Sequence, residues 1–298
     1  MLTTIQSRYK RATCKVWRID ALKLLQSLRP ETVSLIISSP PYFMGKEYDQ
    51  SGSPDDFVAQ HERLFPQLVR VLKPGGSLCW QVGHHVRGGI EIPLDALVYF
   101  VSRKSPELVL RNRIIWTFNH GSHSAKRFSG RHETILWFTK GDDYTFNLDA
   151  VRVPQRYPGK RHYQGPNKGK WSGNPLGKNP GDVWDIPNVK ARHPEKTDHP
   201  CQFPCALVRR LILALSNKGD VVLDPFLGSG TTCVTSLLEQ RNFVGSEKSS
   251  KYVAIARQRI DQVVRGHPKI RLDLPVRLPR GNEAVAIAPP HFARSPEG

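Results

Sequence analysis

Several features that mark whole classes of protein are missing from this sequence. No apolar run approaches the roughly 18 residues that a membrane-spanning helix needs. The N-terminal stretch MLTTIQSRYKRATCKVWRID lacks the apolar core of a signal peptide. The five cysteines are odd in number and scattered, which argues against a disulfide framework and favours a reducing compartment. We therefore expect a soluble, cytoplasmic protein without a membrane segment.

Acidic residues are also scarce. The chain has 26 Asp and Glu against 44 Lys and Arg, which gives a formal net charge of +18. This balance favours a polyanionic partner, with nucleic acid as the first candidate. Charge alone leaves an evenly basic surface as the alternative. The charge is concentrated, however, because the segment 151–180 has seven Lys or Arg, five Pro, five Gly and no acidic residue, a composition that cannot form a compact core.

Short apolar runs alternate with amphipathic stretches on both sides of that segment. This rhythm predicts βα units around a mainly parallel sheet, and 298 residues suit one large α/β domain or two smaller ones. The predicted strands span 15–19, 33–38, 77–82, 112–118, 133–139, 220–224 and 242–247. The predicted helices span 21–28, 55–73, 93–103, 205–216, 231–240 and 251–264, with a kink or break at Pro66.

One of the predicted strands runs into a glycine turn, VVLDPFLGSGTT (221–232). The turn is not a P-loop, because Gly-Lys-Ser/Thr is missing, and it is not a standard dinucleotide fingerprint. Asp224, Gly228 and Gly230 could contact a ligand at the carboxyl edge of the sheet, or the turn could be only a tight connection between a strand and a helix. Glu247 ends the next strand, where a carboxylate can hold a ribose, although it could also cap the following helix. Together these features favour an adenosine-containing ligand.

A second strand, VSLIIS (33–38), stops at two consecutive prolines in SPPY (39–42). Taken alone, this tetrapeptide would be an ordinary stiff turn. Together with the glycine turn it resembles the amino-directed DNA methyltransferases that use S-adenosylmethionine. Four further segments resemble that family in the expected order, namely IDALKLL (19–25), RVLKPGGSLCWQVG (70–83), RHETILWFTKG (131–141) and HPCQFPCALVRRLI (199–212).

The order of these motifs is similar to the circularly permuted β group of the family. The resemblance implies a Rossmann-like α/β methyltransferase sheet, mostly parallel with one antiparallel strand hairpin, and with helices on both faces. It also implies a catalytic half at 1–140, a basic target-recognition region at 141–198, a cofactor-binding half at 199–265, and a flexible tail at 266–298.

The resemblance assigns catalysis to the tetrapeptide. Ser39 and the carbonyl of Pro40 would accept hydrogen bonds from the two N–H groups of an exocyclic base amine, and Pro41 would help to hold that carbonyl. Tyr42 would stack on a base swung out of the duplex. Asp20 could contact adenine or only cap a helix. The residues predicted to bind S-adenosylmethionine are Asp224, Pro225, Phe226, Gly228, Ser229, Gly230, Thr231, Glu247, Asp20, His199 and Pro200.

Family members whose tetrapeptide begins with serine are typically cytosine-N4 methyltransferases, so we expect that activity. We also expect a second copy of the chain, in a homodimer, and a separately encoded restriction endonuclease as partners. Adenine-N6 methylation and methylation of RNA are the alternatives, and a DNA-binding protein without catalysis is a third. Phe203 departs from the family, in which many members have lysine. We expect no metal site, since His199, Cys201 and Cys205 lack a suitably spaced fourth ligand.

Double-stranded DNA is the expected substrate, and the basic segment is the expected place of contact. Most of its cations should bind phosphates, which gives affinity but little sequence information. The residues predicted to contact DNA are Arg152, Arg156, Lys160, Arg161, Lys168, Lys170, Trp171 and Lys178.

Overall fold

The computed structural model describes residues 4–42, 52–118, 121, 123–190, 192–272 and 287. The chain divides into two compact units, of which the first comprises 1–146 and 182–273 and the second contains Asn147–Gly181. Of the predicted tail, residues 273–286 and 288–298 lie outside the described residues. In the described ranges, no helix combines the length and the apolar character that crossing a bilayer requires.

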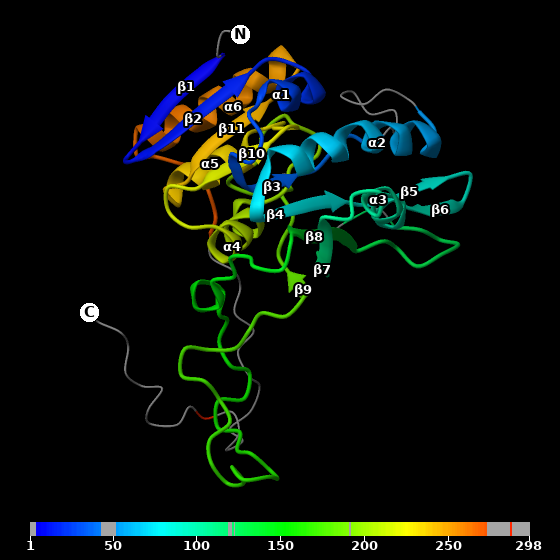
Figure 1. Cartoon of the computed structure of the whole chain (residues 1–298). Helices are drawn as coiled ribbons and strands as arrows, with labels where there is room; N and C mark the ends of the chain where they lie inside the picture. Colours follow the sequence, from blue (N-terminus) through cyan, green and yellow to red (C-terminus); the bar gives the residue numbers. More distant parts are fainter. Residues whose placement is uncertain are drawn as a thin grey trace. The chain divides into compact units, whose positions relative to one another are not determined.

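A nine-stranded sheet forms the centre of the first unit (Figure 1). Neighbouring strands are parallel from β2 to β4, and β9 is parallel to β7, whereas β1–β2, β4–β8 and β8–β7 are antiparallel. In order across the sheet the strands are β1 (Ile5–Tyr9), β2 (Ala12–Trp17), β11 (Asn242–Ser246), β10 (Val221–Asp224), β3 (Val33–Ser38), β4 (Leu72–Val82), β8 (His132–Lys140), β7 (Leu108–Thr117) and β9 (Val183–Asp185). The predicted mostly parallel methyltransferase-like sheet is confirmed, and the edge strand β1 adds an antiparallel pair that was not predicted.

Helices cover both faces of this sheet. Helices α1 (Ala21–Ser27), α2 (Pro54–Val71) and α3 (Leu94–Ser102) pack in sequence against one another over one face. Alternate residues of β4, Leu78, Trp80 and Val82, point into the core beneath them. The second set, α4 (Cys205–Leu215), α5 (Thr231–Leu238) and α6 (Ser250–Val264), packs in the same way on the other side.

The neighbouring strands β3 and β10 determine where the SPPY tetrapeptide and the glycine turn lie. Val222 pairs with Leu35 and Leu223 pairs with Ile36 in parallel register. The chain leaves β3 toward α2 and leaves β10 toward α5, so the two connections go to opposite faces. Open α/β sheets bind ligands in the crevice at such a topological switch point. The sheet thereby brings the SPPY tetrapeptide and the glycine turn to one edge.

The second unit is smaller than the region predicted at 141–198. Strand β9 pairs with β7, and Trp184 at its centre is buried, so residues 182–198 of the predicted region belong with the sheet. A strand of only three residues has too little pattern to be recognised in a sequence. Within the second unit, a 3-10 helix, η1, spans Leu148–Val151.

Helix α2 continues through Pro66 without the predicted break. The ring removes one backbone hydrogen bond, but the helix buries Leu64 and Phe65 before the proline and Leu68 and Val69 after it. Burial on both sides therefore maintains the helix. A Ser53–Asp56 capping box begins it.

The same helix buries a histidine in the aromatic core. His61 Nδ1 lies 2.7 Å from the carbonyl oxygen of Phe57, and the indole of Trp80 donates to His61 Nε2 at 3.0 Å. The proton therefore sits on Nδ1, and the imidazole is neutral. Burial lowers the pKa of His61 to about 4.

We expect His61 to make the stability of the fold sensitive to acid. Its folded pKa is depressed, so its contribution is complete above the ordinary pKa near 6.5 and is lost as the pH falls from there toward 4. The difference in unfolding free energy between the wild type and His61→Gln should shrink in that range, by at most about 1.4 kcal/mol per pH unit. Urea unfolding at several pH values measures it. The exposed His123→Gln is the control, and parallel curves for the wild type and His61→Gln would contradict the assignment.

Candidate active site

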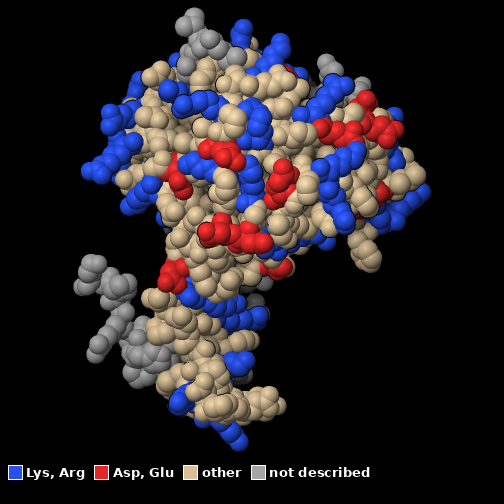
Figure 2. All heavy atoms as spheres, in the orientation of Figure 1, with Lys and Arg blue, Asp and Glu red and all other residues tan. Residues whose placement is uncertain are grey.

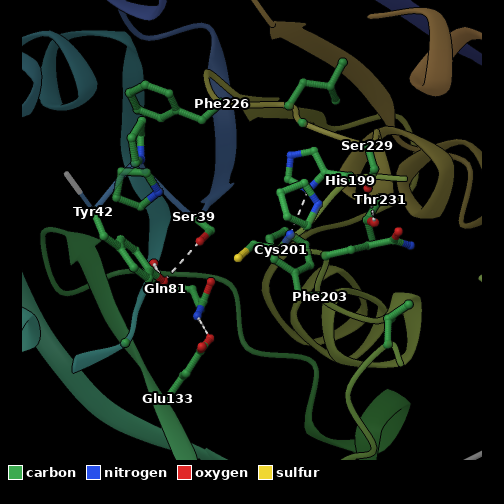
Figure 3. Close-up of a pocket in the computed structure, with 18 of the residues that line it drawn as sticks. Ser39, Tyr42, Gln81, Glu133, His199, Cys201, Phe203, Phe226, Ser229 and Thr231 are labelled. Atoms are coloured by element: carbon green, nitrogen blue, oxygen red, sulfur yellow. Dashed lines mark hydrogen bonds between the residues drawn. The ribbon is translucent and has the colours of Figure 1, made fainter. Parts of the chain in front are cut away.

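A cavity of about 480 Å³ opens at the carboxyl edge of the sheet, within the first unit. Figure 3 shows two groups of side chains facing each other across it, one around Ser39 and Tyr42 and the other around His199 and Ser229. The predicted site residues that line the cavity are Asp20, Ser39, Pro40, Pro41, Tyr42, His199, Pro200, Pro225, Phe226, Gly228, Ser229, Thr231 and Glu247.

The tetrapeptide forms the first wall. Ser39 Oγ lies 3.3 Å from the hydroxyl of Tyr42, and that hydroxyl donates to the carbonyl oxygen of Gln81 at 3.5 Å. Ser39 and Tyr42 are half-buried and Pro40 is buried. The end of β4 thus holds the tyrosine ring in place beside the serine. The arrangement leaves a hydroxyl and an aromatic ring available at the cavity surface.

A polar pair from two other strands lies next to this wall. Gln81 Nε2, at the end of β4, donates to the Glu133 carboxylate near the start of β8, as the dashed line in Figure 3 marks. The antiparallel register, with Val82 opposite Thr134, brings them together. Neither residue was predicted as part of the site, although both lie within the segments that resemble the family. The pair can offer both donors and acceptors to the edge of a bound base.

Asp224 is the central acceptor behind the glycine turn. Its carboxylate accepts from Ser38 Oγ at 2.6 Å, Thr232 Oγ1 at 2.7 Å and the backbone N of Phe226 at 3.1 Å. Burial raises the pKa of Asp224 to about 6, while these hydrogen bonds act in the opposite direction. The Asp224 side chain is 1 % exposed and does not line the cavity, so these contacts show a structural role in the turn. Its predicted contact with a ligand stays a prediction.

The two glycines of the turn have different roles. Gly228 has a φ of +52°, and a Cβ at this position would lie 3.0 Å from His199 Nε2 at the cavity wall. Gly230, with a φ of +84°, does not line the cavity; its Cβ would lie 3.0 Å from the Cβ of Ala256 in α6. Only Gly228 leaves the main chain open toward a ligand, and Gly230 is needed for helix packing.

Glu247 has a structural role and also lines the cavity. One carboxylate oxygen accepts from the backbone N of Gly228 at 3.0 Å, and the other accepts from the backbone N of Ser249 at 2.8 Å. Burial raises its pKa. The predicted helix-terminal contact is thus observed at Ser249. Each oxygen has a second lone pair, so the carboxylate can still accept from a ligand hydroxyl.

His199 and Asp20 are held by their own local contacts. The backbone N of Cys201 donates to His199 Nδ1 at 3.2 Å, and the imidazole lies 4.4 Å from the ring of Tyr252, centroid to centroid. Burial lowers the pKa of His199 to about 4, so the ring is neutral with its proton on Nε2. Asp20 Oδ1 accepts from Leu22 N at 2.9 Å, which confirms its capping role. Its contact with adenine stays a prediction.

A buried ionic network supports the glycine turn from below. The guanidinium of Arg259 donates to the carbonyl of Ser229 at 3.0 Å and to Thr231 Oγ1 at 2.9 Å, and lies 3.8 Å from the Glu195 carboxylate. Glu195 also accepts from the backbone N of Cys205, where α4 begins. One ion pair therefore joins the turn to α4 and α6. Glu195 lies in the region predicted to recognise DNA, so its place beneath the turn could not be anticipated.

Other cavity residues come from segments with no predicted role in the site. Phe203, which stands where many family members have lysine, lines the cavity. Among the described residues, no group of three His, Cys, Asp or Glu side chains could hold a metal ion. The remaining wall residues that sequence patterns did not indicate include Gln60, Trp116, Phe118, Arg127, Asn188, Lys190, Lys248 and Tyr252.

All eight residues predicted to contact DNA belong to the second unit. Figure 2 shows Lys and Arg on the surface of Asn147–Gly181, which is drawn within the green part of the chain in Figure 1. The guanidinium of Arg161 lies 3.6 Å from the ring centroid of Trp171, and residues 161 and 171 form a β-bridge. The cation and the aromatic ring are therefore held together, while Tyr163 is largely exposed. The contact of these residues with DNA stays a prediction.

We expect Asp224→Ala to destabilise the protein by about 3 kcal/mol, because it leaves three buried donors unsatisfied. Asp224→Asn should cost about 1 kcal/mol, since its remaining oxygen can serve Ser38 and Phe226 and the Thr232 hydroxyl can rotate to accept. Urea unfolding compares the two, with the exposed Asp182→Ala as the control. Equal losses for alanine and asparagine would contradict the three-donor arrangement.

Comparison with known proteins gives the family that the sequence motifs resemble. Residues 33–258 match the N6/N4 methyltransferase family described as "DNA methylase". The chain is 44% identical over 245 residues to the type II methyltransferase M.BglII of Bacillus subtilis, covering 82% of this chain and 68% of that protein. It is 34% identical over 249 residues to the DNA adenine methyltransferase YhdJ of Escherichia coli (strain K12), covering 81% of each.

Solved structures show the same fold. The PvuII DNA methyltransferase (cytosine-N4-specific) has a TM-score of 0.68 at 19% identity and covers 92% of this chain and 100% of that one. A putative DNA modification methylase of Thermus thermophilus, TTHA0409, complexed with S-adenosyl-L-methionine, has a TM-score of 0.60 at 27% identity and covers 84% of this chain and 96% of that one. The protein therefore belongs to the N6/N4 DNA methylase family and is a DNA methyltransferase.

Proposed function

We propose that the protein methylates the exocyclic N4 of cytosine at a specific site in duplex DNA. The observation that carries this proposal is Ser39, a neutral hydroxyl at the head of the tetrapeptide and on the cavity wall. The adenine-N6 reaction is the second candidate, because a relative that is 34% identical is named an adenine methyltransferase. Similarity to type II methyltransferases supports a place in a restriction-modification system, beside a separately encoded endonuclease.

The cofactor is S-adenosylmethionine, which supplies an electrophilic methyl group on a sulfonium when it is bound. The cavity residues fit it. The main chain at Gly228 has no Cβ to block a ligand, and the Glu247 carboxylate can accept from ribose hydroxyls. Phe226, held edge-on to Trp80 with 6.2 Å between ring centroids, provides an apolar wall. Phe203 provides no cation for the carboxylate of the cofactor, but Lys248 also lines the cavity.

Ser39 and Pro40 act on the base amine. An exocyclic amine is a weak nucleophile because its lone pair is delocalised into the ring. Ser39 Oγ and the Pro40 carbonyl accept hydrogen bonds from its two N–H groups, which localises that lone pair and directs it for in-line attack. No strong base is needed beforehand, since the nitrogen is strongly acidic once it is methylated and positively charged, and its proton passes to water. The neutral serine is therefore sufficient for the reaction.

Tyr42 and the Gln81–Glu133 pair position the base. The hydrogen bond from Tyr42 to the Gln81 carbonyl keeps the ring on the cavity wall, where it can stack on an extruded base. Glu133 orients the amide of Gln81, so the pair can meet the polar edge of that base. The cations of the second unit bind the phosphates of the duplex.

The product decides between the two candidate reactions. The purified protein is incubated with S-adenosylmethionine and mixed-sequence duplex DNA, and the nucleosides are analysed by mass spectrometry. We expect N4-methylcytosine, and parallel reactions with RNA should give no methylated base. N6-methyladenine alone would establish the adenine reaction instead, and C5-methylcytosine would overturn the direct-attack mechanism. Mapping the methylated positions gives the recognition sequence.

Ser39→Ala should lower the turnover number about 100-fold, as expected for the loss of one positioned hydrogen-bonding group. The dissociation constant for S-adenosylmethionine, measured by calorimetry, should change less than twofold, because the serine acts on the base. Tyr42→Phe is the matched variant. It removes the hydroxyl near Ser39 but keeps the stacking ring, so it should cost less. Full activity in Ser39→Ala would remove the catalytic assignment.

A further inference from the structure

The connection between β7 and β8 has an exposed aromatic side chain. Phe128 is 99% exposed, and no other large apolar side chain that the structure describes is exposed to that extent. A single exposed apolar residue is common and needs no explanation by itself. The position of this one, and the residues around it, distinguish it from the other exposed apolar side chains.

The residues on either side of Phe128 reach the catalytic cavity. Arg127 and Gly130 line it together with Ser39 and Tyr42. Phe128 is thus located at the mouth of the cavity, between two residues that form part of its wall. Its own side chain is directed into solvent and not into the cavity, because it is almost fully exposed and does not line the wall.

Contacts with a neighbouring hairpin hold this part of the chain. The hairpin consists of β5 (His84–Arg87) and β6 (Ile90–Pro93). Arg127 Nη1 lies 3.6 Å from the Glu91 carboxylate of β6. Gly130 packs so closely on His84 of β5 that a Cβ at this position would clash with the imidazole ring. Phe128 is therefore anchored on both sides.

The surrounding charge matches a polyanion. The segment HSAKRFSGR (123–131) contains Lys126, Arg127 and Arg131 and no acidic residue. Two further cations, Lys190 and Lys248, line the same cavity. Cations that bind phosphates, together with an aromatic ring that can stack on bases, are the combination with which proteins hold opened nucleic acid strands. None of these residues belongs to the basic segment at 151–180.

We propose that residues 123–131 form a second DNA-contacting element, and that Phe128 enters the base stack where the target nucleotide has left it. Extruding a base costs a few kcal/mol of lost stacking and pairing. A ring inserted into the gap restores part of that stacking, and the cations on either side hold the adjacent phosphates. The inference rests on the proposed methylation of a flipped base in duplex DNA, but it does not depend on which base is the target.

Phe128→Ala tests this role with two duplexes. Both contain the mapped recognition site, and in one of them the target base is mispaired, so that little free energy is needed to extrude it. On the paired duplex the variant should lose about tenfold in kcat/KM, in keeping with the loss of one stacking contact. On the mispaired duplex it should stay within twofold of the wild type. Phe128→Trp, which keeps a stacking ring, should retain activity on both.

The matched control is Phe100→Ala, which removes a phenylalanine that is 69% exposed on α3 and does not line the cavity. It should leave both rates unchanged. Equal losses of Phe128→Ala on the paired and mispaired duplexes, or no loss on either, would overturn the inserted ring while leaving the proposed function intact. A wild-type protein that methylates no duplex would overturn both proposals. Thermal unfolding of Phe128→Ala checks that the fold is retained.

Discussion

The arrangement of the active site depends on one buried hydrogen bond, from Ser38 Oγ to the carboxylate of Asp224. The catalytic tetrapeptide begins one residue after Ser38, and the cofactor turn begins one residue after Asp224. These two residues are 186 positions apart in the sequence. Because β3 and β10 are neighbours in parallel register, the bond sets how far each motif projects beyond the sheet. The positions of the tetrapeptide and of the glycine turn at the cavity therefore depend on the Ser38–Asp224 pair.

The Asp224 carboxylate suits this position because it accepts three hydrogen bonds and has no donor of its own that would need a partner. Its burial is costly, as the raised pKa shows, and the donors offset that cost. Glu195 and Arg259 act in a comparable way beneath the turn, where an ion pair is satisfied by main-chain groups and hydroxyls. Ser39 and Tyr42, to which we assign the reaction, are half-buried and line the cavity.

Much of the fold could be predicted from the sequence, as could the meeting of the tetrapeptide and the glycine turn at one edge of the sheet. Alternating apolar runs indicated the parallel strands, and the tetrapeptide and glycine turn indicated the edge where they meet. The Gln81–Glu133 pair could not be predicted, because it depends on the antiparallel register of β4 and β8. The sequence places Asp224 at the end of a strand but does not show that three donors already occupy it. Phe128 likewise reads as one aromatic residue in a polar loop, and only the structure shows that it is exposed and lies between two residues of the cavity wall.

The second unit closes on itself near its two ends. Val153 and Lys178 exchange two backbone hydrogen bonds, at 2.9 and 2.8 Å, so residues 154–177 form a loop that this pair closes. The loop can change in length or composition without moving the points where the chain joins the sheet. Such a segment can therefore differ between relatives while the sheet stays the same.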